Sequence, residues 1–223
     1  MGEAVRFTAN GRDAEGYLAR PRSGAGPGVV VIQEWWGLVP HIKDVADRLA
    51  NEGYLALAPD LFHGARTTEP TEAQRLLQQL DFPRAVKDMS GAVGHLLAHE
   101  ARRGDAVGSV GFCMGGALSL LLATARPELK ACVTFYGIPD QADYAKLQGA
   151  VLGHFAEHDD FASSAAVERL RKTLSGLAKP FEFHTYPGTE HAFFNDARPE
   201  VYEKDAAQLA WRRTLQFLEA QLR

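Results

Sequence analysis

Short apolar runs recur along this chain, and segments with helical spacing of apolar residues separate them. The runs with the strongest strand character cover residues 28–32, 54–58, 106–110, 131–136, 151–155 and 181–186. Most of these runs are apolar almost without interruption, which is typical of parallel strands buried on both faces. Two further short strands, at residues 5–7 and 16–19, flank a polar turn at Asn10 and Gly11. They predict an antiparallel hairpin at the start of the fold.

Helical patterns fill the gaps between the strands. Apolar stripes are formed by Ile42, Val45 and Leu49, by Val86, Met89, Val93 and Leu96, and by Trp211, Leu215, Leu218 and Leu222, while residues 116–123 are apolar throughout. We interpret these stripes as contacts with the core. The alternation of strands and helices predicts a single α/β domain over residues 1–223, a three-layer α/β/α sandwich around a mostly parallel sheet. The polar stretch at residues 63–71 is expected to be a long loop at the rim of a pocket.

Composition excludes several classes of protein. Hydrophobic residues make up 46% and charged residues 23%, as in ordinary globular proteins, and the formal net charge is −4 with no basic block, so we expect no nucleic-acid partner. No apolar run approaches about 18 residues and the first residues lack signal-peptide character, so we expect no membrane association. Cys113 and Cys132 do not suggest a disulfide framework. These features favour a cytoplasmic protein, either a monomer or a small homo-oligomer.

Residues 111–115 read Gly-Phe-Cys-Met-Gly and lie between a strand pattern and a helix pattern. This is the G-x-nucleophile-x-G arrangement, in which a sharp turn exposes the central side chain at the tip of a strand. Glycine at both ends permits so tight a bend. Cys113 would lie at a helix N-terminus, where free N–H groups and the helix dipole favour a thiolate. The motif alone is equally compatible with a buried cysteine in a glycine-rich turn.

A thiol with a pKa of about 8.5 needs a base, and the base needs an orienting partner. Asp159 follows the strand pattern at residues 151–155, and His191 follows the one at residues 181–186. The order nucleophile, acid, histidine is that of hydrolases with this turn. Because the carboxyl ends of parallel strands meet at one edge of a sheet, we expect Cys113, Asp159 and His191 to converge there. Asp160 competes with Asp159 for the same role.

The loop after residues 28–32 begins with Gln33-Glu-Trp-Trp-Gly37. We expect the backbone N–H groups of Trp35 and Met114 to form an oxyanion hole. Glu34 directly follows five apolar residues, so it is either a buried ion-pair partner or part of the site, and we favour the site. Aromatic residues that are candidate walls of a substrate pocket, or else plain core, are Trp36, Phe62, Tyr136 and Phe193.

We expect no cofactor and no metal ion. His154, His158 and Asp159 have the residue types of a metal site. The spacing of the two histidines would place them on one face only in a helix, whereas the segment has the pattern of a strand and its exit.

Taken in order, the motifs resemble the dienelactone hydrolase family of α/β hydrolases. The residues that carry the resemblance are Gln33-Glu-Trp-Trp-Gly37, Ala58-Pro-Asp-Leu-Phe62, Gly111-Phe-Cys-Met-Gly-Gly116, Phe135-Tyr-Gly137, Gly153-His-Phe-Ala-Glu-His-Asp159 and Tyr186-Pro-Gly-Thr-Glu-His-Ala-Phe193. The resemblance implies an α/β-hydrolase fold and a Cys113–His191–Asp159 triad that hydrolyses a small ester or lactone. It also implies that Glu34 contacts the resting thiol and helps to take its proton when substrate binds.

One departure from the family concerns the substrate. Members that open dienelactone bind its carboxylate with arginines, one of them four residues after the catalytic histidine, where this chain has Asn195. The second family arginine falls in the region that corresponds to about Pro70 of this chain. Arg66 is a candidate substitute for that arginine. A neutral ester, lactone or thioester therefore fits at least as well as dienelactone.

Two other functions remain open at this point. One is a glutaminase-like cysteine amidohydrolase, which also uses a Gly-x-Cys-x-Gly turn. Its acid typically follows the histidine by two positions, where this chain has Phe193. The other is a non-catalytic, hydrolase-like protein that binds a ligand or senses oxidation through Cys113.

Overall fold

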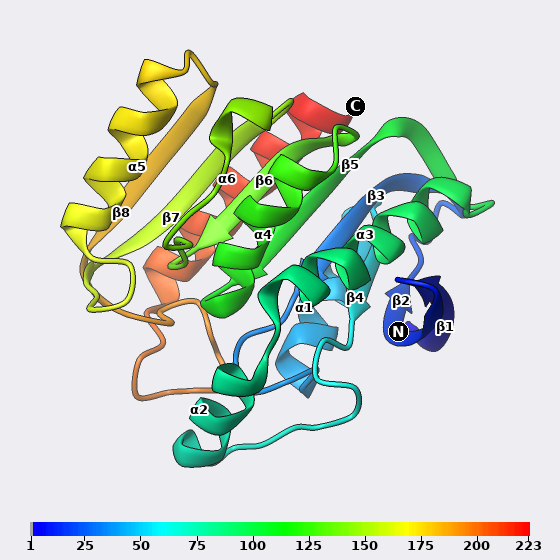
Figure 1. Ribbon diagram of the computed structural model, residues 1–223, viewed down its shortest axis with the longest axis horizontal. Helices are drawn as coiled ribbons and strands as arrows, with labels where there is room; N and C mark the ends of the chain where they lie inside the picture. Colours follow the sequence, from blue (N-terminus) through cyan, green and yellow to red (C-terminus); the bar gives the residue numbers. More distant parts are fainter. Residues whose placement is uncertain (1) are drawn as a thin grey trace.

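A computed structural model describes residues 2–223 as one eight-stranded sheet with helices on both faces (Figure 1). Met1, which the expected domain includes, lies outside the described residues. The strands are β1 (Glu3–Ala9), β2 (Arg12–Ala19), β3 (Gly26–Ile32), β4 (Leu55–Pro59), β5 (Arg102–Phe112), β6 (Leu129–Phe135), β7 (Ala150–His158) and β8 (Phe181–Glu190). Their spatial order is β1-β2-β4-β3-β5-β6-β7-β8. Within residues 2–223 only the β1–β2 and β2–β4 pairs are antiparallel, so the prediction of a mostly parallel sheet is confirmed.

Residues 2–223 contain six α-helices. They are α1 (Pro40–Asn51), α2 (Pro70–Gln79), α3 (Phe82–Ala98), α4 (Met114–Ala125), α5 (Ser164–Gly176) and α6 (Lys204–Leu222), and a short 3₁₀ helix spans Tyr144–Lys146. The two large hydrophobic clusters among residues 2–223 form the layers: residues of α3, α4 and α5 pack on one face and residues of α1 and α6 on the other (Figure 1). The predicted three-layer sandwich is therefore confirmed. No helix among residues 2–223 is both long and apolar enough to cross a membrane.

The two strands that lead to Glu34 and to Cys113, β3 and β5, are deeply buried where they approach these residues. All seven residues of β3 are buried, as are the last six of β5. These strands form a parallel pair in which Ile32 lies opposite Gly111. The segments that follow β3 and β5 therefore leave the sheet at the same edge, and the parallel strands β7 and β8 end at that edge as well.

Two differences from the sequence analysis concern surface helices. The expected loop at residues 63–71 ends at Pro70, where α2 begins, because proline suits the first position of a helix. Helix α5 begins after Ser163, whose hydroxyl accepts a hydrogen bond from the Ala166 N–H. Both helices bury short apolar stripes, Ala73 and Leu76 in α2 and Val167, Leu170 and Leu174 in α5, which the sequence analysis did not single out.

Candidate active site

Cys113 lies at the sharp turn between β5 and α4 that the motif predicts. Its φ of 54° is in the left-handed region, a strained conformation that is common at functional sites. The two motif glycines make this turn possible, because a Cβ on Gly111 would lie 1.9 Å from the Gly115 carbonyl oxygen. A Cβ on Gly115 would lie 2.4 Å from the carbonyl oxygen of Ile32 at the end of β3. The turn is thus packed too tightly for a side chain at either glycine position.

Asp159 and His191 form a hydrogen-bonded pair. His191 Nδ1 lies 2.8 Å from Asp159 Oδ2, although the two residues are 32 positions apart in the chain. The other carboxylate oxygen of Asp159 accepts hydrogen bonds from the backbone N–H groups of Phe161 (2.8 Å) and Ala162 (2.9 Å). The Asp159 side chain is only 1% exposed, whereas Asp160 is exposed. Of the two adjacent acids, Asp159 is therefore the one that orients the imidazole.

The imidazole of His191 is held in a charged state by its neighbours. Burial opposes the charge, but the hydrogen bond to Asp159 and the nearby Cys113 sulfur outweigh it and raise the pKa of His191 to about 10. Its Nε2 atom is buried and has no hydrogen-bond partner among residues 2–223. The ring therefore presents one free nitrogen beside the thiol while Asp159 fixes the other.

Glu34 is buried at the start of the loop after β3 and has partners from two other segments. Asn195 Nδ2 donates to its Oε2 at 2.7 Å, and the Tyr136 hydroxyl donates to its Oε1 at 3.3 Å. Burial, together with the charges of Glu34 and Cys113, raises the pKa of Tyr136 well above its usual value, so the phenol keeps its proton and acts as a donor. Contact between Glu34 and the resting thiol stays a prediction.

A cavity of about 960 Å³ unites most of the residues that the sequence pointed to. Among those that line it are Cys113, His191, Asp159, Glu34, Trp35, Trp36, Met114 and Tyr136. Trp35 follows Glu34 in the loop after β3, and Met114 is the first residue of α4. The two expected oxyanion donors thus belong to segments that meet at this cavity.

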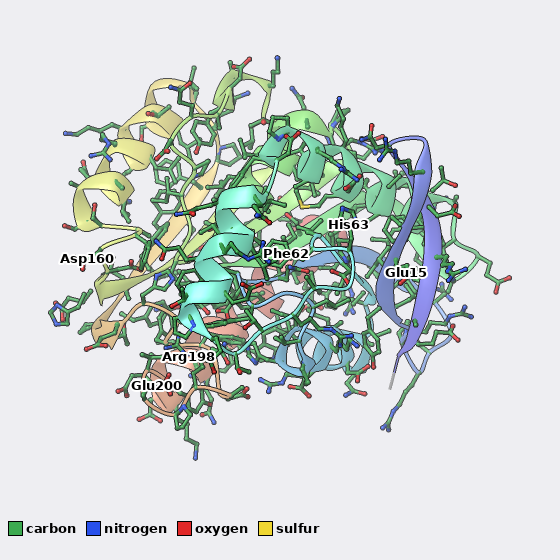
Figure 2. The ribbon with its side chains drawn as sticks, turned by 60° about the horizontal axis from the view of Figure 1, so that its bottom comes forward. Glu15, Phe62, His63, Asp160, Arg198 and Glu200 are labelled. Carbon is green, nitrogen blue, oxygen red and sulfur yellow. The ribbon has the colours of Figure 1, made fainter. Side chains whose placement is uncertain are left out.

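The structure does not bring Phe62 and Phe193 to this cavity. Phe62 and His63 lie on the other side of α2 from Asp160 (Figure 2), at a separate cavity of about 220 Å³. Phe193 is fully buried, and its ring centroid lies 5.6 Å from that of Tyr136. Ala192, in the turn just after β8, has a positive φ of 68°, and Phe193 packs into the core. A glutaminase-like enzyme would have its acid at position 193, where this chain has the buried phenylalanine.

Arg198 and Phe161 line the cavity but were missed in the sequence analysis. The Arg198 guanidinium lies 5.4 Å from the centre of the Trp36 ring and donates a hydrogen bond to Glu200 (Figure 2). The ring of Phe161, a residue that is 70% exposed, lies 4.9 Å from the His191 ring. Both residues belong to loops, where no periodic pattern shows which side chains face inward. Arg66, the candidate substitute for a family arginine, does not line the cavity and packs against Gly37.

The histidines of β7 do not come together around a common point. His154 is fully buried, and its two ring nitrogens lie 2.8 Å from the Tyr186 hydroxyl and 3.0 Å from the Thr214 hydroxyl. His158 is exposed, 3.6 Å from the carboxylate of Glu157. Within residues 2–223, no group of three or more histidine, cysteine, aspartate or glutamate side chains has an arrangement suited to a metal ion.

Comparison with known proteins agrees with the geometry. The Dienelactone hydrolase family profile matches residues 14–222. "Protein usf" of Aquifex pyrophilus is 36% identical over 231 residues, covering 100% of both chains. A "Putative carboxymethylenebutenolidase" of Aquifex aeolicus is 32% identical over 233 residues with the same coverage. A crystal structure from Klebsiella pneumoniae, a "Putative Dienelactone Hydrolase", has a TM-score of 0.86 and 28% identity and covers 98% of this chain and 99% of that one. This chain therefore belongs to the dienelactone hydrolase family and has the α/β-hydrolase fold.

Proposed function

We propose that this protein is a cysteine-dependent carboxylic-ester hydrolase that acts on a small ester or lactone through Cys113, His191 and Asp159. The observation that carries the proposal is the 2.8 Å hydrogen bond between His191 and Asp159 in the same cavity as Cys113 at its strained turn. Membership of a family of hydrolases supports the reaction class.

In the first half of the reaction, the Cys113 sulfur attacks the carbonyl carbon of the ester. His191 holds the proton that the thiol has lost, and Asp159 stabilises the resulting imidazolium. The tetrahedral intermediate carries its negative charge on the former carbonyl oxygen, which accepts hydrogen bonds from the Trp35 and Met114 N–H groups. One such donor contributes roughly 3–4 kcal/mol to transition-state stabilisation. Collapse of the intermediate breaks the C–O bond, and His191 gives its proton to the leaving alkoxide.

In the second half, water replaces the alcohol. His191, now neutral, takes a proton from the water as it attacks the thioester carbonyl. The same oxyanion hole holds the second tetrahedral intermediate, which releases the carboxylic acid and restores the sulfur and the imidazolium. With a lactone, the alcohol and the acid are two ends of one product.

Glu34 is the proposed auxiliary acceptor of the thiol proton. It is buried in the cavity, and its two donors, Asn195 and Tyr136, are neutral. A carboxylate oxygen is a hydrogen-bond acceptor, so it can accept the proton of a nearby thiol when substrate displaces that thiol, before the proton passes to His191. Replacing Glu34 with Gln removes the charge and keeps the shape, and we expect it to slow formation of the acyl-enzyme.

The test uses the two cysteines of the chain as a matched pair. Cys132 is buried, and burial raises the pKa of its thiol to about 11, so it is a poor nucleophile. We expect the Cys113→Ala variant to lose hydrolysis of p-nitrophenyl butyrate and of γ-butyrolactone, and Cys132→Ala to retain it. Intact-mass measurement of wild type during turnover should show one added acyl group, absent from Cys113→Ala. Undiminished turnover in purified Cys113→Ala would exclude the proposed nucleophile.

A further inference from the structure

The loop that follows β8 is tied to α1 through one carboxylate. Asp196 Oδ1 lies 3.0 Å from His41 Nδ1, and Asp196 Oδ2 accepts a hydrogen bond from the Arg48 guanidinium. We call these three residues the Asp196 clamp. They join positions that are about 150 residues apart in the chain, and both His41 and Arg48 belong to α1. The clamp thus connects two segments that leave the sheet independently.

The clamp is built into the core on one side. The His41 side chain is 1% exposed, and its ring packs edge-on against Phe112 and Phe194, two rings that stack on each other, with 6.2 Å from its centroid to each of theirs. Phe112 immediately precedes Cys113, and Phe194 immediately precedes Asn195. His41 therefore touches the bases of both segments that bring side chains to the cavity.

The carboxylate of Asp196 is charged in this setting. Partial burial opposes the charge, but the hydrogen bond and positive charge of Arg48 outweigh it and lower the pKa of Asp196. A carboxylate can only accept, so His41 donates through Nδ1–H. Arg48 also pairs with Asp44 one turn earlier in α1, at 2.5 Å, which fixes the guanidinium against its own helix.

Both ends of the clamp continue into the active site. Helix α1 starts six residues after Glu34, at the end of the loop that holds the oxyanion donor Trp35. At the other end, Asp196 follows Asn195, the residue that donates to Glu34, and lies in the same short loop as His191. The Asn195–Glu34 hydrogen bond and the clamp are thus two neighbouring links between the same two segments.

We propose that Asp196, held by His41 and Arg48, is a positioning residue that fixes the loop of residues 191–198 against the loop after β3, so that His191 meets Cys113 and Asn195 meets Glu34. The inference rests on the proposed function, because it concerns the same site. Asp196 touches no substrate in this role and acts through its neighbours.

The first experiment separates positioning from stability. Four variants weaken the clamp in different ways: Asp196→Asn, His41→Gln, Arg48→Met and Arg48→Lys. The matched control is Arg126→Met, which removes a half-buried arginine that bonds Glu128 and the Ser90 carbonyl on another part of the surface. We expect Asp196→Asn and Arg48→Met to lower kcat per titrated active site by about tenfold with KM changed less than threefold, because small displacements of catalytic groups cost large factors in rate. Arg48→Lys, which keeps the charge, should restore part of the loss, and Arg126→Met should leave kcat unchanged.

The second readout does not need ester hydrolysis. Iodoacetamide reacts with the thiolate, so the rate of Cys113 alkylation at pH 7, followed by intact mass, reports whether His191 is in place. We expect alkylation several-fold slower in Asp196→Asn and Arg48→Met than in wild type and in Arg126→Met. If kcat per active site and the alkylation rate both stay at wild-type values while only Tm falls, the clamp is purely structural and the inference is overturned. If no protein hydrolyses esters but the clamp variants still alkylate slowly, the proposed function fails and the positioning role stands.

Discussion

At the scale of single residues, two adjacent carboxylates at the end of β7 differ in what they contact. Asp159 is buried and bonds His191, whereas Asp160 is exposed at the rim of the cavity. Asparagine at position 159 would keep the shape but lose the charge that stabilises the imidazolium. We expect Asp159→Asn to lower kcat by about 10³–10⁴-fold, as loss of the aspartate charge does in comparable triads. Steady-state kinetics on a neutral aryl ester would measure this.

Asp160→Asn is the matched control for that experiment. It makes the same Asp-to-Asn substitution at the neighbouring position, and we expect kcat to stay within about twofold of wild type. The imidazole titration, followed by NMR, should show a lower pKa for His191 in Asp159→Asn only, because the hydrogen bond and charge of Asp159 help to raise it. Equal losses of activity in the two variants would contradict the assignment.

The raised pKa of His191 also predicts how stability depends on pH. The pKa is about 10 in the folded protein and 6.5 in the unfolded chain, so folding favours the protonated ring. That contribution is present in full below pH 6.5 and is lost as the pH rises through about 10. We expect the difference in urea unfolding midpoint between wild type and His191→Ala to shrink from pH 6 to pH 10.5. A difference that stays constant over this range would show that the charged ring does not stabilise the fold.

At the scale of secondary-structure elements, the turn between β5 and α4 depends on glycines that no other residue can replace. An alanine at Gly111 would place its Cβ 1.9 Å from a backbone oxygen that is fixed in the first turn of α4. We expect Gly111→Ala to destabilise the protein by about 3 kcal/mol, the upper end of the cost of overpacking, because backbone cannot move aside as a side chain can. Chemical denaturation would measure the change.

Gly94, four positions before the last residue of α3, provides the opposite case. A Cβ there would meet no atom within 4 Å. Gly94→Ala should therefore stabilise the protein by about 0.5–1 kcal/mol, because alanine loses less backbone entropy in a helix. If both alanine variants had the same stability, the close packing of the turn would not be what requires glycine.

The same elements show how far the sequence could predict the structure. The buried strands and the turn at Cys113 could be found, because continuous apolar runs and the glycine spacing are local signals. Asp159 and His191 could be placed at one edge, because parallel strands end together. Arg198 could not be placed in the cavity and Phe193 could not be placed in the core, because the positive φ at Ala192 and the irregular loop after it leave no periodicity to read.

At the scale of the whole molecule, the site depends on four segments that the sheet topology brings to one edge. The loop after β3 supplies Glu34 and Trp35, the turn after β5 supplies Cys113, and the loops after β7 and β8 supply Asp159 and His191. Contacts between these segments help to fix their relative positions. The hydrogen bonds of Asn195 to Glu34 and of Asp196 to α1 are such contacts, and a single sequence does not show them because their partners are more than 140 positions apart.

The charge around the cavity predicts a preference among substrates. The chain has a net charge of −4, and Glu157, Asp160 and Glu190 line the cavity, whereas Arg198 is paired with Glu200. Like charges lower the local concentration of an anionic substrate, and salt screens this effect. We expect kcat/KM for p-nitrophenyl butyrate to exceed that for p-nitrophenyl hemisuccinate by about tenfold at low salt, after correction for their uncatalysed rates. The ratio should shrink in 0.5 M NaCl and in an Asp160→Asn, Glu190→Gln double variant. A preference for the anionic ester that Arg198→Met abolishes would instead show that Arg198 binds a substrate carboxylate.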